Sequence, residues 1–241
     1  MIKKGLSLLI LLILWWFVAL SIHNEIILPP PHLVFENIIT LIKQPSFYQI
    51  ILATFLRAHI AFIISITVAL FLALICFKLP TIEELISPWL KCLQTIPQIS
   101  FIILLLFWVN NEQSIFWVVF LMIFPLAYFN ILEALKAIEQ DYLDIIVLYH
   151  QPWYYNLKKA YLPLASSGIK ATLQVGLPLA LKVTVMSEVL IHTHIGIGRA
   201  LSNARANIDM VNVFAWTIVL VVLVSLETYF ISWVFSRKTS S

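Results

Sequence analysis

The sequence predicts an all-α, polytopic membrane protein with six transmembrane helices, and three observations support this fold class. Of the 241 residues, 61% are hydrophobic and only 11% are charged, whereas a soluble domain is roughly half apolar and a quarter charged. The mean hydropathy is +0.97. The apolar residues gather into six runs of about the length that a helix needs to cross a bilayer. This composition argues against a soluble globular enzyme and against a disordered chain.

The six runs, separated by polar breaks, are expected to form a single transmembrane domain over residues 1–241. The first run, 6–22, follows Lys3 and Lys4 as in a signal peptide. Its two tryptophans and the lack of a small-residue cleavage site favour a retained first span instead. The core spans, between 50 and 236, are predicted at 50–76, 85–109, 114–134, 164–190 and 211–236.

Basic residues near the span ends predict that both termini are cytoplasmic. In this orientation the basic residues of the cytoplasmic segments are Lys3, Lys4, Lys78, Lys136, Lys158, Lys159, Arg237 and Lys238. Those of the outer segments are only Lys43, Arg199 and Arg205. The loop 135–163 is then cytoplasmic, whereas 24–48 and 191–210 face outward.

The loop 135–163 is long enough to need structure of its own. Apolar residues recur at helical spacing from 135 to 149, and Pro152 suits the first turn of a second helix over 153–161. A short helix–turn–helix beneath the membrane is typical of a docking element. The alternative is an amphipathic hairpin that rests on the lipid headgroups.

The fifth predicted span carries an unusual number of polar residues. Lys170, Gln174, Pro178 and Lys182 recur every four residues, which places them on one stripe of a helix, and Glu188 lies near its outer end. Charges inside a membrane usually face a cavity or a protein partner. We therefore expect Gln174, Pro178, Lys182 and Glu188 to line a polar path or to contact a second copy. The alternative is that Lys170 reaches the inner interface and Glu188 lies among outer headgroups.

Motifs for catalysis, metal binding and nucleotide binding are missing from the sequence. It contains no phosphate-binding loop, no H-E-x-x-H and no G-x-S-x-G. Cys76 and Cys92 do not have metal-ligand spacing, and His192 and His194 have no clear third ligand. The net charge of +3 comes from scattered residues. We therefore expect no catalysis, no metal, no cofactor and no nucleic-acid binding in this chain.

The loop 135–163 resembles a cytoplasmic motif of permease subunits of type I ABC importers, E-A-A-x3-G-x9-I-x-L-P. Asp144 opens the motif, His150 takes the glycine position, and Leu162-Pro163 closes it without a gap. Asp replaces Glu, Ile replaces both Ala, and Ala replaces Ile. The glycine permits a positive φ between two short helices, and His tolerates that conformation better than most residues, at a cost.

Landmarks along the rest of the chain resemble the nitrate/sulfonate/taurine branch of these importers, which also includes permeases for thiamine-precursor pyrimidines. They are Leu28-Pro29-Pro30-Pro31, Thr54-Phe55-Leu56-Arg57, Pro88, Ile96-Pro97, Phe124-Pro125, the stretch from Lys182 to Glu188, and Gly196-Ile197-Gly198. Each landmark is short, but together they occur in a consistent order over nearly the whole chain.

The resemblance implies a type I ABC importer permease fold, in a transport subunit that is not itself an enzyme. It implies a homodimer in the bacterial cytoplasmic (inner) membrane, with the translocation path between the two copies. ATP and Mg would be bound by a separate pair of ATPase subunits. An extracytoplasmic binding protein would deliver the substrate, either a small anion (nitrate, a sulfonate or taurine) or a thiamine-precursor pyrimidine.

Residue roles follow from the same resemblance. The ATPase would contact the loop at Asp144, Tyr149, His150, Gln151, Pro152, Leu162 and Pro163. The binding protein would dock near Gly196, Gly198, Arg199 and Arg205, although plain solvation of the two arginines is the alternative. A secondary transporter without an ATPase stays open, but such folds commonly show inverted repeats and more spans. An intramembrane enzyme would need a facing nucleophile and base, or a metal set.

Overall fold

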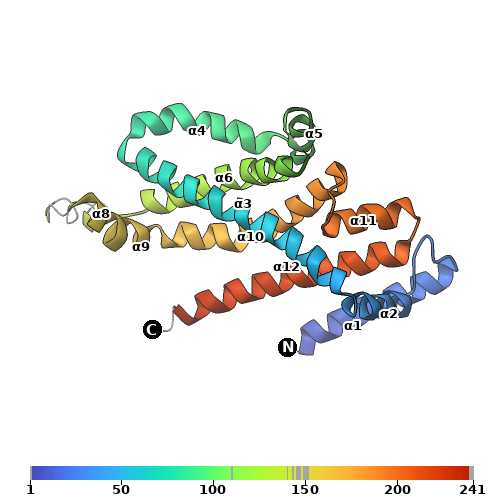
Figure 1. The fold of residues 1–241 in the computed structure, drawn as a ribbon. Coiled ribbons are helices and arrows are strands. Elements are labelled where there is room, and N and C mark those ends of the chain that lie inside the picture. Colours follow the sequence, from blue (N-terminus) through green and yellow to red (C-terminus); the bar gives the residue numbers. More distant parts are fainter. Residues whose placement is uncertain are drawn as a thin grey trace.

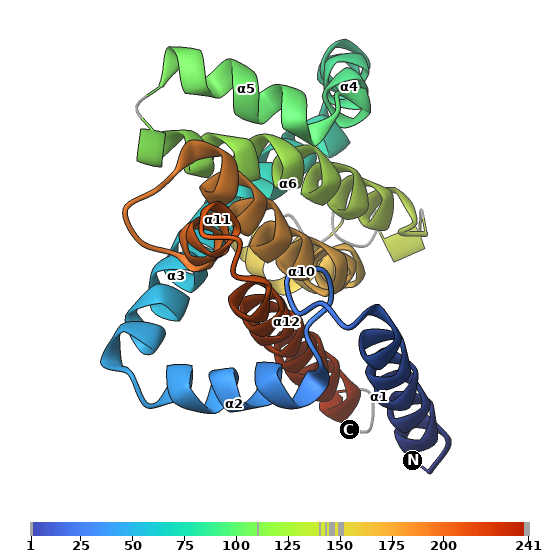
Figure 2. The same ribbon diagram turned by 90° about the vertical axis from the view of Figure 1, so that its right-hand side faces the viewer.

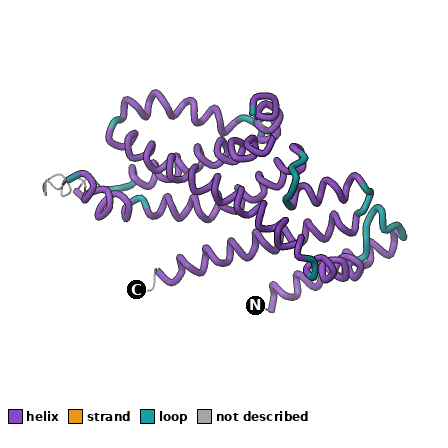
Figure 3. The backbone as a smooth tube through the Cα atoms, viewed as in Figure 1, coloured by secondary structure: helices purple, strands orange, loops and turns teal. Residues whose placement is uncertain are grey.

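The computed structural model describes residues 2–109, 111–139, 141–142, 144, 148 and 152–238, and every regular element in these ranges is a helix (Figures 1 and 3). The longer helices are α1 (Ile2–Ile22), α3 (Pro45–Lys78), α4 (Pro80–Thr95), α6 (Asn111–Lys136), α10 (Ser166–Ile191) and α12 (Met210–Lys238). The shorter ones are α2 (Pro31–Ile42), α5 (Gln98–Trp108), α8 (Trp153–Asn156), a π-helical turn η1 (Leu157–Tyr161), α9 (Leu162–Leu164) and α11 (Ile197–Ala206). The predicted all-α class is confirmed.

Proline sets where several helices begin. Pro31, Pro45 and Pro80 each occupy the first turn of their helices, α2, α3 and α4. Proline suits this position because its fixed φ is helical and the missing N–H would have no partner there. The breaks on either side of α3 are therefore abrupt, and α3 runs without interruption for 34 residues.

The centre of the molecule is a bundle of α3, α6 and α10. Ala61 and Phe62 of α3, Val119 of α6 and Ala180 of α10 belong to one buried cluster. Close approach of α10 to α6 depends on Gly168, where a Cβ atom would overlap the backbone of α6 at Asn130 and Ile131. Small residues at helix crossings are typical of membrane bundles, because tight packing replaces the hydrophobic effect there.

Among the described residues, four helices are long and apolar enough to cross a membrane: α3, α6, α10 and α12. The segment 85–109 was predicted as one continuous span. In the structure it is divided between α4 and α5, which meet at an angle of 100°. Ile96 is extended between them, as expected for a residue that precedes a proline. The pair makes a fifth candidate span, and α1 is a shorter apolar helix over Leu9–Ile22. The count of six spans stays a prediction.

The outer segments hold two helices that the sequence analysis treated as polar breaks. In α2, Pro31 and Val34 are buried, and Asn37 donates a hydrogen bond to Asn212 of α12 over 2.9 Å. In α11, the buried positions include Ile197, Gly198, Ser202 and Ala204. Figure 2 shows α12 lying between α10 and α2, in agreement with its contacts to both.

The C-terminal end of α12 and the segment 153–164 lie on the left in Figure 1, and the N-terminal end of α1 points the same way from a position near the middle of the view. The helix α11 and the connection from α1 to α2 lie toward the opposite side. This arrangement agrees with the predicted grouping of segments on two sides of a membrane, and the cytoplasmic location of the termini stays a prediction. The predicted second loop helix is confirmed as α8, η1 and α9, which continue to Leu164.

Candidate functional site

A buried carboxylate near the C-terminal end of α10 forms the most connected polar site in the described part of the chain. The side chain of Glu188 is fully buried. Its Oε1 accepts a hydrogen bond from Arg57 Nη1 over 2.9 Å, and its Oε2 accepts from Thr54 Oγ1 over 2.9 Å. The backbone N–H of Gly198 also donates to Oε2, over 2.9 Å. A buried carboxylate is costly unless it is paired and hydrogen-bonded, and here it is both.

The partners of Glu188 are themselves tied to the connection between α10 and α11. Thr54 Oγ1 accepts a hydrogen bond from the N–H of Ile197 over 2.8 Å while its own hydrogen goes to Glu188. Arg57 Nη1 also donates to the carbonyl of Ile195. Its other terminal nitrogen, Nη2, lies 3.3 Å from Oε1 of Glu112 at the start of α6. The network therefore joins α3, α6, α10 and the loop before α11.

Two glycines make room for this carboxylate. Gly196 has φ of 148°, a conformation that L-residues rarely adopt, and a Cβ atom there would lie 2.5 Å from the Glu188 carboxyl group. At Gly198, a Cβ atom would overlap both Glu188 Cβ and the carbonyl oxygen of Val185. Glycine is required at both positions because the loop backbone lies directly against the Glu188 side chain.

Three of the segments that carry the resemblance to the importer family meet at this network, although they lie far apart in the sequence. They are 54–57, 182–188 and 196–198, and Thr54 and Glu188 are separated by 134 positions. The sequence analysis singled out Glu188 but did not connect it with Thr54 or Arg57. Within one chain the side chain of Glu188 is enclosed and its oxygens are occupied, and its predicted contact with a path or a second copy stays a prediction.

The predicted polar stripe of α10 lies on the surface of the chain. Gln174 and Lys182 are exposed and Pro178 is half-buried, while the opposite face, including Gly176 and Ala180, is buried. An amide and an ammonium group therefore emerge from a helix that is long and apolar enough to cross a membrane. Lys170, at the inner end of the stripe, lies 5.3 Å from the centre of the Phe235 ring of α12.

The segment predicted to couple to an ATPase is anchored on the C-terminal end of α3. Tyr161 lies edge-on to Phe77, with ring centroids 6.2 Å apart, and Lys78 Nζ lies 5.2 Å from the Tyr161 ring centre. Asp144, Pro152 and Pro163 are exposed, and Leu162 is half-buried. Tyr149, His150 and Gln151 lie outside the described residues.

The four residues predicted near a docking surface are divided by the structure. Gly196 and Gly198 are buried against Glu188, whereas Arg205 is exposed. Arg199 lines an outward cavity of about 410 Å³ between α2, α11 and α12, together with His194, Asn203 and Asn212. Within the described residues, no group of three or more His, Cys, Asp or Glu side chains is placed to hold a metal ion.

Comparison with known proteins gives a consistent identification. Residues 65–240 match the family described as the binding-protein-dependent transport system inner membrane component. A taurine transport system permease protein of Escherichia coli is 24% identical over 141 residues, a match that covers 56% of this chain and 51% of the relative. A protein of Methanocaldococcus jannaschii whose name is that of an ABC transporter permease is 22% identical over 191 residues, covering 77% of this chain and 72% of that protein.

The chain thus spans about half the length of the taurine permease that it matches. The family match covers well over half of the chain and includes α6, α10 and α12. It also includes two of the three segments that meet at Glu188. Together with the apolar helices, this match shows that the chain is a multi-pass membrane permease of the ABC transporter type, a member of the binding-protein-dependent transport system inner membrane component family.

Proposed function

We propose that this permease forms the substrate path of an ATP-driven importer, with a second copy of itself facing the exposed stripe of α10. The main support for this proposal is that Gln174 and Lys182 are exposed on a long apolar helix whose other face is buried. A lysine held against lipid at the centre of a span costs about 2.5–3.5 kcal/mol on insertion scales. A water-filled path between two copies would remove that cost by hydrating both side chains.

The inner segment supports coupling to a separate ATPase pair, which would bind ATP and Mg. Residues 153–164 form a short helical arm whose Pro163 is exposed and whose Tyr161 rests on the end of α3. A subunit that pushes on this arm would act on α3 through Phe77 and Lys78. Because α3 also carries Thr54 and Arg57, a rigid-body movement would reach the Glu188 network at the outer side.

The outward side supports delivery of the substrate by a binding protein. Arg199 and Arg205 give this face positive charge, and the cavity beside α11 presents amide groups. A small anion such as a sulfonate fits this chemistry, and the relative named for taurine transport supports the same class. A thiamine-precursor pyrimidine is the second substrate class, and uptake assays separate the two.

The test is uptake into proteoliposomes that contain the permease with its co-purified ATPase and binding protein. We expect ATP-dependent uptake of radiolabelled taurine or another sulfonate. ATP-dependent uptake of a radiolabelled pyrimidine instead would assign the second substrate class. Lys182→Met should lower the uptake rate about tenfold or more without loss of folded protein, because it removes the charge from the path. Lys43→Met changes an exposed lysine at the end of α2 and should leave uptake unchanged. Equal uptake by Lys182→Met and wild type would contradict the proposed path.

A further inference from the structure

A second pair of ionisable side chains meets between two long apolar helices, apart from the Glu188 network. His59 of α3 and Glu227 of α12 approach to 2.8 Å between Nε2 and Oε1, and their side chains are only 20% and 8% exposed. Both residues lie within helices that are long and apolar enough to cross the membrane. Ionisable groups in such helices usually pair with one another and mark a ligand or ion site.

The pair leaves acceptor capacity on the carboxylate. His59 Nδ1 lies 2.8 Å from the carbonyl oxygen of Phe55, which can only accept, so Nδ1 carries a hydrogen. If neither Nε2 nor Glu227 Oε1 carried a proton, their lone pairs would repel one another at 2.8 Å. One further proton therefore lies between these two atoms. The second carboxylate oxygen of Glu227, Oε2, receives no hydrogen bond from any described residue. A buried carboxylate oxygen without a donor is unusual and costly.

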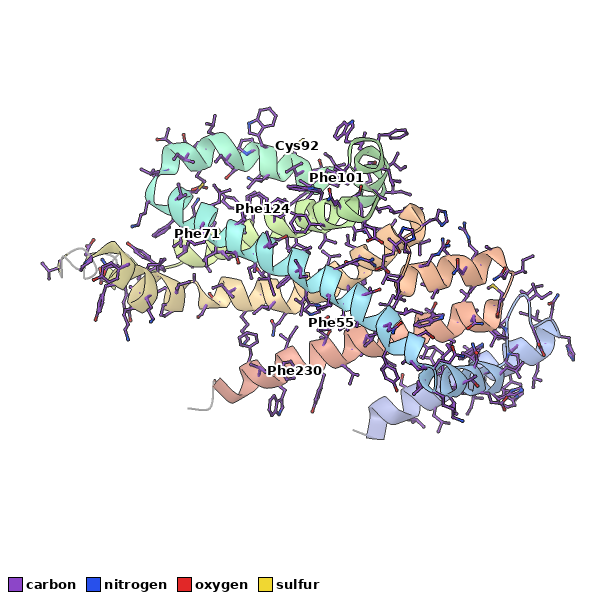
Figure 4. The ribbon with its side chains drawn as sticks, viewed as in Figure 1. Phe55, Phe71, Cys92, Phe101, Phe124 and Phe230 are labelled. Carbon is purple, nitrogen blue, oxygen red and sulfur yellow. The ribbon has the colours of Figure 1, made fainter. Side chains whose placement is uncertain are left out.

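The carboxylate faces a cavity that is otherwise apolar. This cavity, of about 570 Å³, lies between α3, α10 and α12 and is lined by both members of the pair. Its other walls include Phe55, Leu177, Phe230 and Phe235. Figure 4 shows Phe55 on α3 and Phe230 on α12, the two helices that the pair bridges. The volume lies within the roughly 300–1,000 Å³ that is typical of small-molecule sites.

We propose that this cavity is a binding site for a small compound with an N–H donor, preferably an amine, on an apolar or aromatic body. The N–H group would donate to the unsatisfied oxygen of Glu227. The apolar body would lie among the leucine and phenylalanine side chains, where aromatic rings also favour a nearby cation. An anion would find no free donor here, because both ring nitrogens of His59 are already occupied and the other walls are apolar. The site does not depend on the proposed transport role.

Binding of tritiated benzylamine to the full-length permease in nanodiscs tests the site, with empty nanodiscs as the background. We expect saturable binding that unlabelled benzylamine displaces. Ethylbenzene, which has a similar shape but no donor, should not displace it. Glu227→Gln should weaken binding at least tenfold, because it replaces one carboxylate oxygen with a donor. Glu36→Gln changes an exposed glutamate of α2 and should leave binding unchanged.

A second variant keeps the test decisive if Glu227→Gln fails to fold. Leu226 lines the cavity and is 60% exposed, so Leu226→Trp should fill the space without crowding the core. It should weaken binding at least tenfold while His59 and Glu227 remain. The proposal is overturned if no saturable binding occurs, if ethylbenzene competes equally well, or if folded Glu227→Gln or Leu226→Trp binds as wild type does. The assay contains no ATPase, so its failure is distinct from failure of ATP-driven uptake.

Discussion

At the scale of single residues, Glu188 shows how a charge can be kept inside a membrane helix. Its carboxylate receives donors from a guanidinium, a hydroxyl and a backbone N–H. The guanidinium supplies the compensating charge, and the other two donors satisfy the remaining lone pairs. Removing one partner leaves the others committed to a buried charge, so the cost of a substitution exceeds the value of a single hydrogen bond.

Arg57→Met should therefore destabilise the permease by about 3–5 kcal/mol, because Glu188 would remain buried without its counter-charge. The measurement is unfolding of the detergent-solubilised protein in increasing SDS, followed by tryptophan fluorescence. Arg205→Met is the matched control, since Arg205 is exposed on α11, and exposed substitutions usually change stability by no more than about 0.5 kcal/mol. If both variants unfold like the wild type, the Glu188 network does not stabilise the fold.

Gly198→Ala tests the close approach of the loop to α10. The added methyl group would overlap Glu188 Cβ and a backbone carbonyl, neither of which can move easily. We expect a loss of about 1–3 kcal/mol, as for other overpacked sites. Gly176→Ala is a matched glycine control, because its nearest obstacle is the movable Phe62 ring at 3.0 Å. It should cost clearly less in the same SDS titration, and an equal cost for the two variants would contradict this interpretation of Gly198.

Sequence reasoning found the segments of this network but could not assemble them. The resemblance to an importer family singled out 54–57, 182–188 and 196–198 in order. The pairing of Arg57 with Glu188, across 131 positions, depends on how α3 and α10 cross, which no local pattern encodes. The pair of His59 and Glu227 was missed, although each is an ionisable residue in a predicted apolar run and could have been identified by that signal.

At the scale of elements, hydropathy predicted the long helices well and their interruptions poorly. The runs at 50–76, 114–134, 164–190 and 211–236 correspond to α3, α6, α10 and α12. The run 85–109 is nearly continuous in hydropathy, so the bend at Ile96-Pro97 is hidden unless the effect of the proline on its neighbour is given weight. The short helix α11 averages to a polar signal and looks like a loop, whereas α2 is apolar but, at 12 residues, too short to stand out as a span.

The predicted loop 135–163, which runs into the helical arm 153–164, is the element that should connect this permease to an ATPase. His150→Pro should abolish ATP-driven uptake while leaving membrane insertion intact, because proline removes an N–H and fixes φ where the resembled motif has a turn glycine. His150→Asn should retain uptake, since Asn tolerates a positive φ. The readouts are uptake rate and the amount of permease in the membrane fraction. Unchanged uptake by folded His150→Pro would contradict a docking role for this turn.

At the scale of the whole molecule, two long helices connect the two sides of the membrane through different contacts. The helix α3 meets the inner arm at Phe77 and Lys78 and the outer network at Thr54 and Arg57. The helix α10 starts directly after this arm, at Ser166, and carries Glu188 three residues before its end at Ile191. We therefore expect a displacement of the arm to reach the loop before α11 through these two helices, as the proposed coupling to an ATPase would need.

The central claim is that this permease works with a separate ATPase, and the most direct measurement is purification of the tagged chain from its native membrane in a mild detergent. Mass spectrometry then identifies what co-purifies and in what ratio. The account predicts a near-stoichiometric partner that carries a phosphate-binding loop, together with a second copy of the permease. A partner-free oligomer that still moves solute after ATP depletion would contradict the account and would indicate a secondary transporter.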